Sequence, residues 1–259
     1  MRTQQFARAL LLSGSLVVSA AACAAQTREE GPRPHDGGVQ ERLVSILIPA
    51  VPRAPFSATV STESIRMLAD GSRITLVNHR AIGRDGAGRI FQERRLLVPP
   101  DGKHESVITQ TEIIDPVAHE LYICKPDEQV CQLESYSPPV FAGAPSAIPS
   151  KEKTSREELG KQFIAGLEAS GTRETTIVEP GAIGNDSELH IVREYWYSPQ
   201  LSINLSSKLQ DPRIGTQDFE LSDITLGEPD PKLFKVPPGS QVLDLRRQVR
   251  SPSDNRSPE

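Results

Sequence analysis

Apolar and polar residues alternate along much of this chain, and this alternation predicts β-strands. Within residues 201–209, four of the five odd positions are Leu or Ile, whereas the even positions are Ser, Asn and Lys. Because successive side chains of a strand point to opposite faces, this period of two predicts a strand with one buried face. Residues 107–113 repeat the pattern, and residues 74–76 do so more weakly.

Turn signals separate these runs at short intervals. Asp-Gly pairs at 70–71 and 85–86 favour tight hairpins. Between Phe219 and Leu226 the parity of the apolar positions shifts once, which predicts a bulge near residues 222–223. The chain therefore predicts a mainly β fold, an antiparallel meander of roughly ten strands.

Helical signals are few, and we expect only one or two short helices. Residues 39–48 are one candidate. Residues 154–167 start with capping-box residues, but each Gly in this segment costs a helix about 1 kcal/mol relative to Ala. There we expect a short helical turn at 156–160 followed by strands. Asp230-Pro231 predicts one further turn before the last strand.

The amino terminus has the layout of a secretory signal peptide, residues 1–25. Arg2 and Arg8 precede an apolar run of about 14 residues, which is shorter than the roughly 20 that span a bilayer. Two kinds of processing remain open. Simple cleavage would release a periplasmic or secreted protein, whereas a weak lipobox before Cys23 would acylate that residue and tether the protein to a membrane.

Composition also predicts the division of the chain. Residues 26–39 are polar and rich in Gly and Pro, which predicts a flexible spacer. Residues 40–245 form a single β domain with a long loop at 137–150, and residues 246–259 form a disordered tail. No later segment is long and apolar enough to predict a transmembrane span.

Cys124 and Cys131 flank a six-residue polar loop between strand-like segments. A hairpin would place the two cysteines opposite each other, and export brings oxidising conditions. We therefore predict a disulfide between them. A metal site is not expected, because no second pair of ligands accompanies the cysteines.

Charge and motifs exclude several function classes. The formal net charge is −5 and no basic stripe appears, so we expect no nucleic-acid partner. The five histidines do not pair at metal-ligand spacing. Because the chain also lacks a nucleophile elbow and a phosphate loop, we expect no catalytic residue, metal or cofactor.

Tyr195, Trp196 and Tyr197 form the most concentrated aromatic feature. On a strand, Tyr195 and Tyr197 would share one face and Trp196 would take the other. Such a cluster is either core packing with an exposed rim or part of the wall of an apolar ligand site.

Several short motifs together resemble a group of uncharacterised exported bacterial proteins, over about residues 56–237. These motifs include Leu-Ala-Asp-Gly-Ser-Arg at 68–73, Arg-Asp-Gly-Ala-Gly-Arg at 84–89, Glu-Tyr-Trp-Tyr-Ser at 194–198 and Glu-Pro-Asp-Pro-Lys-Leu-Phe at 228–234. The group has no assigned activity, so the resemblance implies no catalytic residues.

More distantly, the hairpin layout resembles the half-barrels of lipoprotein carriers and of a periplasmic envelope-stress regulator (LolA/RseB-like). This resemblance implies a curved antiparallel sheet that wraps helices and holds acyl chains. The sequence departs from it in having few predicted helices and only 5% aromatic residues, which argues against a large lipid cavity.

Three functions remain open at this point. The first is an envelope binding module that holds an acyl chain or a lipoprotein in a curved sheet. The second is a structural module without a cavity that binds an envelope protein through its edges or linkers. The third is a hydrolase, which would need a nucleophile beside a base in a cleft.

Overall fold

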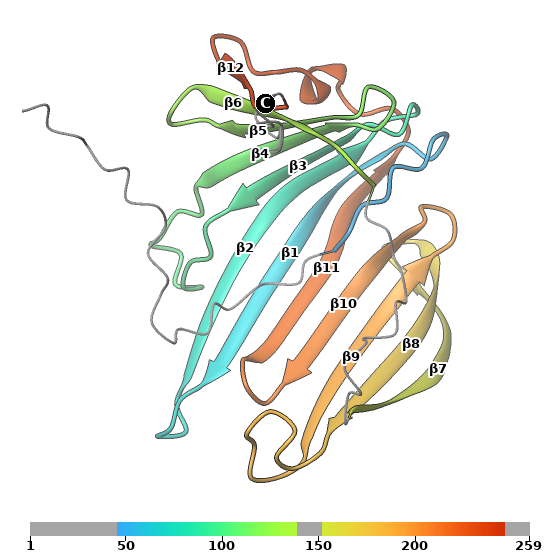
Figure 1. The fold of residues 1–259 in the computed structure, drawn as a ribbon. Coiled ribbons are helices and arrows are strands. Elements are labelled where there is room, and N and C mark those ends of the chain that lie inside the picture. Colours follow the sequence, from blue (N-terminus) through green and yellow to red (C-terminus); the bar gives the residue numbers. More distant parts are fainter. Residues whose placement is uncertain (1–45, 139–151, 247–259) are drawn as a thin grey trace, which may run out of the picture. The chain divides into compact units, whose positions relative to one another are not determined.

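A computed structural model describes residues 46–138 and 152–246, and these residues are almost entirely β (Figure 1). The strands are β1 (Phe56–Met67), β2 (Arg73–Arg84), β3 (Ile90–Arg95), β4 (Ile108–Asp115), β5 (Glu120–Lys125), β6 (Val130–Ser135), β7 (Glu152–Ile164), β8 (Leu167–Val178), β9 (Leu189–Ser198), β10 (Ile203–Asp211), β11 (Gly215–Leu226) and β12 (Gln241–Asp244); η1 (Pro231–Phe234) is a single 3-10 turn.

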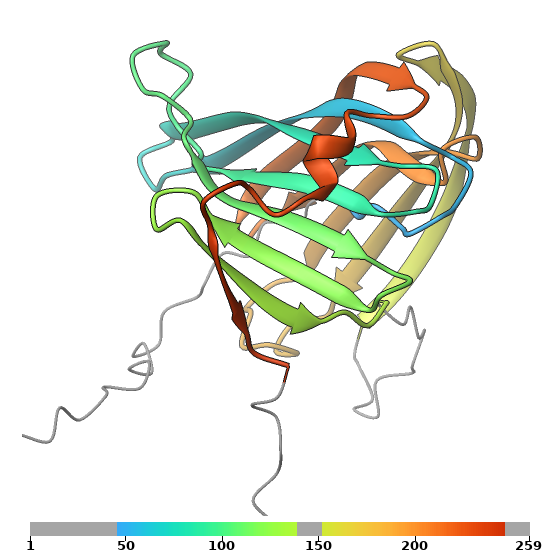
Figure 2. The ribbon, with the colours of Figure 1, turned by 90° about the horizontal axis from the view of Figure 1, so that it is seen from above.

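All twelve strands belong to one sheet, in the order β12-β6-β5-β4-β3-β2-β1-β11-β10-β9-β8-β7. The chain makes one meander from β1 to β6 and a second from β7 to β11, and the two join where β11 pairs with β1. Only β12 is parallel to its neighbour, β6. The sheet curves but stays open, with β12 and β7 at its edges (Figure 2). This architecture confirms the predicted half-barrel-like meander.

Two local predictions are also confirmed. The register between β1 and β11 shifts opposite residues 57–59, and Asp223 there adopts a φ of 51°, as the predicted bulge requires. Asp230 caps η1, because its carboxylate accepts a hydrogen bond of 2.9 Å from the backbone N–H of Lys232. Both signals are local, so the sequence alone suffices to find them.

The helical turn predicted at residues 156–160 is wrong, because this segment lies within β7. Its backbone pairs with β8 along the whole strand, and Gly160, at a φ of 87°, forms a bulge in that ladder. Ala165 and Gly166 both have positive φ and form the tight turn to β8. The helix proposed at 39–48 is not seen in its described part, since residues 46–48 have no regular structure.

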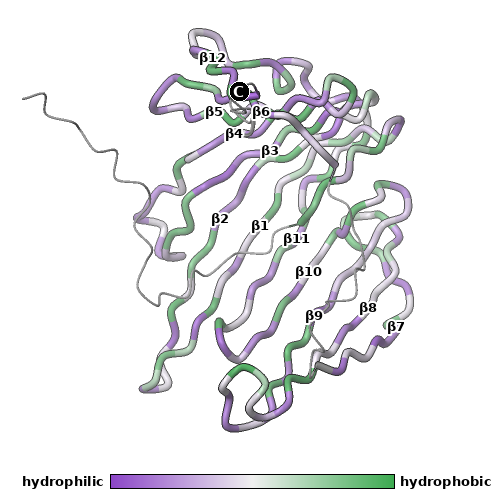
Figure 3. Tube along the Cα trace, in the orientation of Figure 1, coloured by the Kyte–Doolittle hydropathy of each residue, from purple (hydrophilic) through white to green (hydrophobic). Residues whose placement is uncertain are grey.

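The larger apolar core lies against the segment that precedes β1, residues 46–55, which we call the strap. Ile46 and Ile48 of the strap are buried in this core. The sheet contributes its other buried members: Phe56, Ala58, Val60, Ile82, Ile90, Leu167, Ala169, Leu201, Ile203, Leu205, Phe219 and Leu221. Figure 3 shows hydrophobic residues interspersed with hydrophilic ones along the strands, as expected for strands that bury one face.

A smaller core forms beneath η1. Phe234 of η1 packs with Phe91 of β3 and Ile113 of β4, and Tyr122 and Leu233 lie against them. The turn therefore fixes the connection from β11 to β12. The signal peptide at 1–25, Cys23, the spacer at 26–39 and nearly all of the predicted loop and tail lie outside the described residues.

Candidate ligand-binding site

Arg84, at the end of β2, fastens the strap to the sheet. Its side chain is fully buried, and its guanidinium donates to the carbonyl oxygens of Ala54 (2.8 and 3.0 Å), Pro49 (2.9 Å) and Leu201 (2.6 Å). The same guanidinium stacks 5.1 Å from the centre of the Phe56 ring. Burial lowers the pKa of Arg84. The planar fork of an arginine suits this role, because it can donate to several carbonyls at once.

This fastening leaves a hollow of about 510 Å³ between the strap and the β9–β10 end of the sheet. Its lining is mostly apolar: Leu47, Pro49, Val51, Tyr197, Ser202, Ile203 and Asn204. Ile46 and Ile48 face the core, whereas Leu47 between them stays 46% exposed. The volume falls within the roughly 300–1,000 Å³ of small-molecule sites.

The three aromatic residues of β9 lie in three different environments. Only Tyr197 lines the hollow, where it is 40% exposed. Trp196 packs against the large apolar core. Tyr195 donates a hydrogen bond of 3.0 Å from its hydroxyl to Glu174, and the Arg156 guanidinium lies 6.0 Å from its ring. Burial and this carboxylate raise the pKa of Tyr195. The structure thus brings one of the three to a hollow and keeps the other two apart from it.

The remaining lining residues were not singled out by sequence reasoning. Leu47, Pro49 and Val51 belong to an apolar stretch broken by prolines, which carries no strand or helix period. Asn204 lies near a register irregularity between β10 and β9, at residues 204–206. This apolar stretch was the one sequence feature that could have indicated a binding site. Its position in the fold depends on the hydrogen bond from Arg84 to Leu201, which lies 117 residues further along the chain.

Polar groups also lie on the inner side of β2 to β4. Arg80 is 4% exposed, and burial, followed by the nearby charge of Arg94, lowers its pKa to about 10. Glu112 accepts hydrogen bonds from Arg94 (2.9 and 3.0 Å), from Gln110 (2.8 Å) and from Gln92. The buried face of β2 to β4 is therefore partly polar, whereas the apolar hollow lies beside the strap.

Two of the motifs that resemble the exported proteins meet in space. The Glu228 carboxylate accepts the backbone N–H of Gly86 at 3.1 and 3.2 Å, and the Arg89 guanidinium lies 5.3 Å from the Phe234 ring. The loop itself is organised by Asp85, which accepts from the N–H of Ala87 at 3.0 Å and from the N–H of Arg89 at 2.8 Å. These motifs build the junction between β2, β3 and η1.

Cys124 and Cys131 form a disulfide between β5 and β6. The two residues are directly opposite in the antiparallel register, with Cα atoms 4.0 Å apart, and both are buried. The hairpin geometry thus has the form that the spacing of the two cysteines predicts.

One serine–histidine pair lies on neighbouring strands, where Ser61 of β1 is opposite His79 of β2. Ser61 Oγ lies 3.0 Å from His79 Nδ1, but this pair is exposed, and no carboxylate bonds to His79 in the described part of the chain. Neither residue lines the hollow. Residues 46–138 and 152–246 contain no group of three or more His, Cys, Asp or Glu side chains placed to hold a metal ion.

None of the helical structure in the described residues is long and apolar enough to cross a membrane. No family model matches the sequence, and no curated protein matches it.

Several solved structures are similar in fold. An uncharacterised conserved protein from Thermus thermophilus is 12% identical, with a TM-score of 0.39 over 74% of this chain and 91% of that chain. A chain of the MucA/MucB complex of Pseudomonas aeruginosa is 16% identical, with a TM-score of 0.43 over 75% of this chain and 59% of that chain. Lipoprotein LppX of Mycobacterium tuberculosis is 10% identical, with a TM-score of 0.30 over 71% of this chain and 90% of that chain.

Proposed function

We propose that this protein is an exported envelope module that binds a single apolar chain, an acyl chain or the lipid of a lipoprotein, in the hollow beside the strap. The observation that carries the proposal is the exposed apolar lining of this hollow, where Leu47 is 46% and Tyr197 40% exposed. Burying such a side chain fully contributes roughly 1.5–3 kcal/mol. A bound chain would therefore remove from water the surface that the fold leaves open.

The polar groups at the rim suit the same ligand. Ser202 and Asn204 lie beside Ile203 in the lining, and the Tyr197 hydroxyl adds a third polar group. A few polar groups around an apolar pocket typically orient the ligand and do not supply most of its affinity. In this arrangement the chain would lie against Leu47, Val51 and Ile203.

Binding of a fluorescent fatty acid, with native mass spectrometry of the gently purified mature protein, tests this proposal. We expect a stoichiometric apolar ligand in the spectrum and saturable binding that Leu47→Gln and Tyr197→Ala weaken by about fivefold or more. Tyr195→Ala and Leu226→Gln are matched controls, because Tyr195 bonds to Glu174 and Leu226 is 50% exposed, and neither lines the hollow. A ligand-free mass together with no saturable binding would reject the proposal.

One observation favours the second candidate, a protein-interaction module. β7 is a 13-residue edge strand, and its side chains at residues 153–164 are exposed except for the half-buried Leu159 and Ile164. Such edges can accept an added strand from a partner. Its many charged residues, including Lys153, Arg156 and Lys161, act against unspecific pairing. Cross-linking from Lys161 in an envelope extract, with Lys125 at the end of the interior strand β5 as the control site, would test this candidate. Specific cross-links from Lys161 alone would support it.

A further inference from the structure

The buried guanidinium of Arg84 has no carboxylate partner among the residues that the structure describes. Its four hydrogen bonds all go to backbone carbonyl oxygens, those of Pro49, Ala54 and Leu201. Carbonyl groups are dipoles without net charge, so they satisfy the donors but leave the unit positive charge in place. Buried charges in proteins are usually paired. A fully buried cation without a carboxylate therefore lies where the strap meets the sheet.

The segments that frame the hollow beside the strap contribute no negative charge either. Residues 46–62, which include the strap, and residues 195–210, which include the turn from β9 to β10, contain no Asp or Glu. Asp85 follows Arg84 directly, but its carboxylate is bound to the Arg89 guanidinium at 2.7 Å. Burial lowers the pKa of Arg84, and Tyr197 is the one titratable group of the described residues that acts on it, in the opposite direction. No neighbouring carboxylate in the described part of the chain thus cancels the field of Arg84.

This charge lies close to the lining of the hollow. Nη1 of Arg84 donates to the carbonyl oxygen of Pro49 at 2.9 Å, and Pro49 itself lines the hollow. Nη2 donates at 2.6 Å to the carbonyl oxygen of Leu201, the neighbour of the lining residue Ser202. The guanidinium is therefore within one residue of the lining on both the strap side and the sheet side. Its field reaches a ligand in the hollow, although no atom of Arg84 lines it.

The polar residues of the lining can donate hydrogen bonds to an oxyanion. Tyr197, Ser202 and Asn204 each carry an O–H or N–H donor, and none of these side chains is hydrogen-bonded to another described residue. Ser198 is directly opposite Ile203 in the register, and residues opposite each other in a ladder project to the same face. Its hydroxyl is fully buried and has no hydrogen-bond partner within the described residues. The hollow and its surroundings therefore offer several donors and no acidic side chain.

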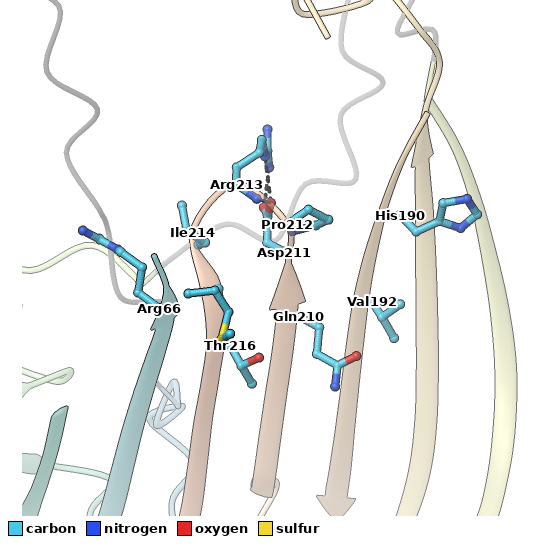
Figure 4. A pocket seen from close by; sticks show the side chains of 11 residues that line it. Arg66, His190, Val192, Gln210, Asp211, Pro212, Arg213, Ile214 and Thr216 are labelled. Carbon is cyan, nitrogen blue, oxygen red and sulfur yellow. Dashed lines mark hydrogen bonds and ion pairs between the residues drawn. The ribbon is translucent and has the colours of Figure 1, made fainter. Parts of the chain in front are cut away.

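Another hollow, at the turn between β10 and β11, differs in that its ionisable groups have acidic partners. Its volume is about 480 Å³ (Figure 4). Arg213 donates from Nε to the Asp211 carboxylate at 2.8 Å, and His190 Nε2 lies 2.6 Å from Glu188. Figure 4 shows the Arg213 guanidinium bound to Asp211. This region therefore serves as the control surface for ligand binding.

We propose that the hollow beside the strap selects an ionised fatty acid, whose carboxylate lies at Tyr197, Ser202 and Asn204 in the field of Arg84. This inference rests on the proposed function, because it names the class of ligand that the same hollow takes. Arg84 keeps all of its bonds to the strap and the sheet, and the single negative charge of the ligand matches its single positive charge. Opposite charges several ångströms apart in a partly buried site change an affinity by about tenfold. A neutral or cationic head on the same chain therefore binds more weakly.

Displacement of the fluorescent fatty acid by three ligands of equal chain length tests the charge preference. The ligands are decanoate, decanamide, whose neutral head has the same shape, and decyltrimethylammonium. We expect decanamide to bind about tenfold more weakly than decanoate, and the cation to bind more weakly still. Leu47→Gln should weaken all three by the same factor, because it removes only apolar contact. Equal binding of decanoate and decanamide, both weakened by Leu47→Gln, would overturn the charge preference and leave the proposed function intact. No saturable binding of any ligand would reject the proposed function itself.

Salt and the variant Arg53→Gln locate the charge without removing the bonds that Arg84 makes to the strap. Arg53 is the one Lys or Arg of residues 46–62, and its side chain is exposed. Because the Debye length is about 3 Å at 1 M salt, an exposed charge loses its effect there, whereas a buried charge is screened much less. We expect the preference for decanoate over decanamide to persist at about 1 M salt and in Arg53→Gln. Its loss under either condition would assign the preference to the surface and overturn the role of Arg84.

The ionisation of the bound ligand gives an independent measurement on the wild type. Decanoate labelled at its carboxyl carbon should titrate in the complex about one pH unit below free decanoate, since a tenfold preference for the anion corresponds to one pH unit. The amide NMR signals of Tyr197 and Asn204 should shift on binding, and those of Val192 and Thr216 in the other hollow should stay in place. A ligand pKa that is unchanged or raised, or amide shifts confined to Val192 and Thr216, would overturn the proposal.

Discussion

The indole ring of Trp196 lies over Gly171 so closely that a Cβ built on Gly171 would stand 2.6 Å from two of its ring carbons. The two residues are directly opposite in the pairing of β8 with β9. Trp196 also packs against the main apolar core. Because residue 171 has no side chain, the only tryptophan of the sequence can pack closely over the backbone of β8.

Gly171→Ala should destabilise the protein by about 1–3 kcal/mol, because the added methyl group meets a rigid ring and forces it away from the core. Urea unfolding followed by the fluorescence of Trp196 measures the loss of stability, and the emission of the folded variant reports the displacement of the indole ring. Gly83→Ala is the matched control, since its Cβ would make ordinary contacts of 3.5 Å with Phe56 and 3.6 Å with Pro229. Equal effects of the two substitutions would contradict the role given to the indole ring.

Arg84→Lys should destabilise the protein by about 2–4 kcal/mol, although the charge is kept. A lysine lacks the planar fork that serves Pro49, Ala54 and Leu201 together, and carbonyls left without a donor in a buried site cost about 1–3 kcal/mol each. The strap should then open first, so limited proteolysis should cut residues 46–55 faster than in the wild type.

Arg53→Lys provides the comparison for this experiment, because Arg53 belongs to the same strap but its side chain is exposed. Its effect on unfolding should stay within about 0.5 kcal/mol, as for most surface substitutions. Unchanged proteolysis of the strap in Arg84→Lys would show that Ile46 and Ile48 hold it without help from the guanidinium.

Local signals explain which parts of this fold could be predicted. The alternation in residues 201–209 correctly placed Leu201, Ile203, Leu205 and Leu209 on a buried face, because a strand with one dry face imposes that period. The bulge at Asp223 and the cap at Asp230 were equally readable, since each depends on residues next to it in the chain.

Long-range contacts explain the failures. β7 was predicted to start with a helical turn, because its capping residues act locally, whereas its pairing with β8 decides its conformation. The hollow beside the strap was not predicted, because it forms only when Arg84 joins Pro49 to Leu201.

Asp211→Asn should lower the free energy of unfolding by about 1–3 kcal/mol at pH 7, because it removes a carboxylate that accepts three hydrogen bonds from Arg213 in the turn between β10 and β11. The pKa of Asp211 is lowered in the folded protein, so the carboxylate contributes its full stabilisation above the unfolded value of about 3.9. This contribution is lost as the pH falls through the lower, folded pKa. Urea unfolding of the wild type and of Asp211→Asn at pH 7, 5, 4 and 3 should therefore show a difference in unfolding free energy that is constant from pH 7 to 5 and shrinks below about pH 4.

The control for this pH series is Asp127→Asn, a change at an exposed carboxylate in the turn between β5 and β6. It should leave the free energy of unfolding within about 0.5 kcal/mol of the wild type at each pH. If the Asp211→Asn difference persisted unchanged at pH 3, the loss of stability would come from packing of the turn between β10 and β11 and not from the charge of the carboxylate.

Reduction of the disulfide between Cys124 and Cys131 should lower the free energy of unfolding by about 2–3 kcal/mol, the value of the chain-entropy model for so short a loop. The hairpin should keep its place in the native sheet, since β5 also pairs with β4 and β6 with β12. Urea unfolding of oxidised and reduced protein measures the loss. The double variant Cys124→Ala with Cys131→Ala should have the same free energy of unfolding as the reduced protein, and the reductant should not change it. This control separates the effect of the disulfide from side effects of the reagent. A larger loss that also unpairs β12, seen as rapid amide exchange at Val242 and Leu243, would instead mean that the bond holds the sheet edge together.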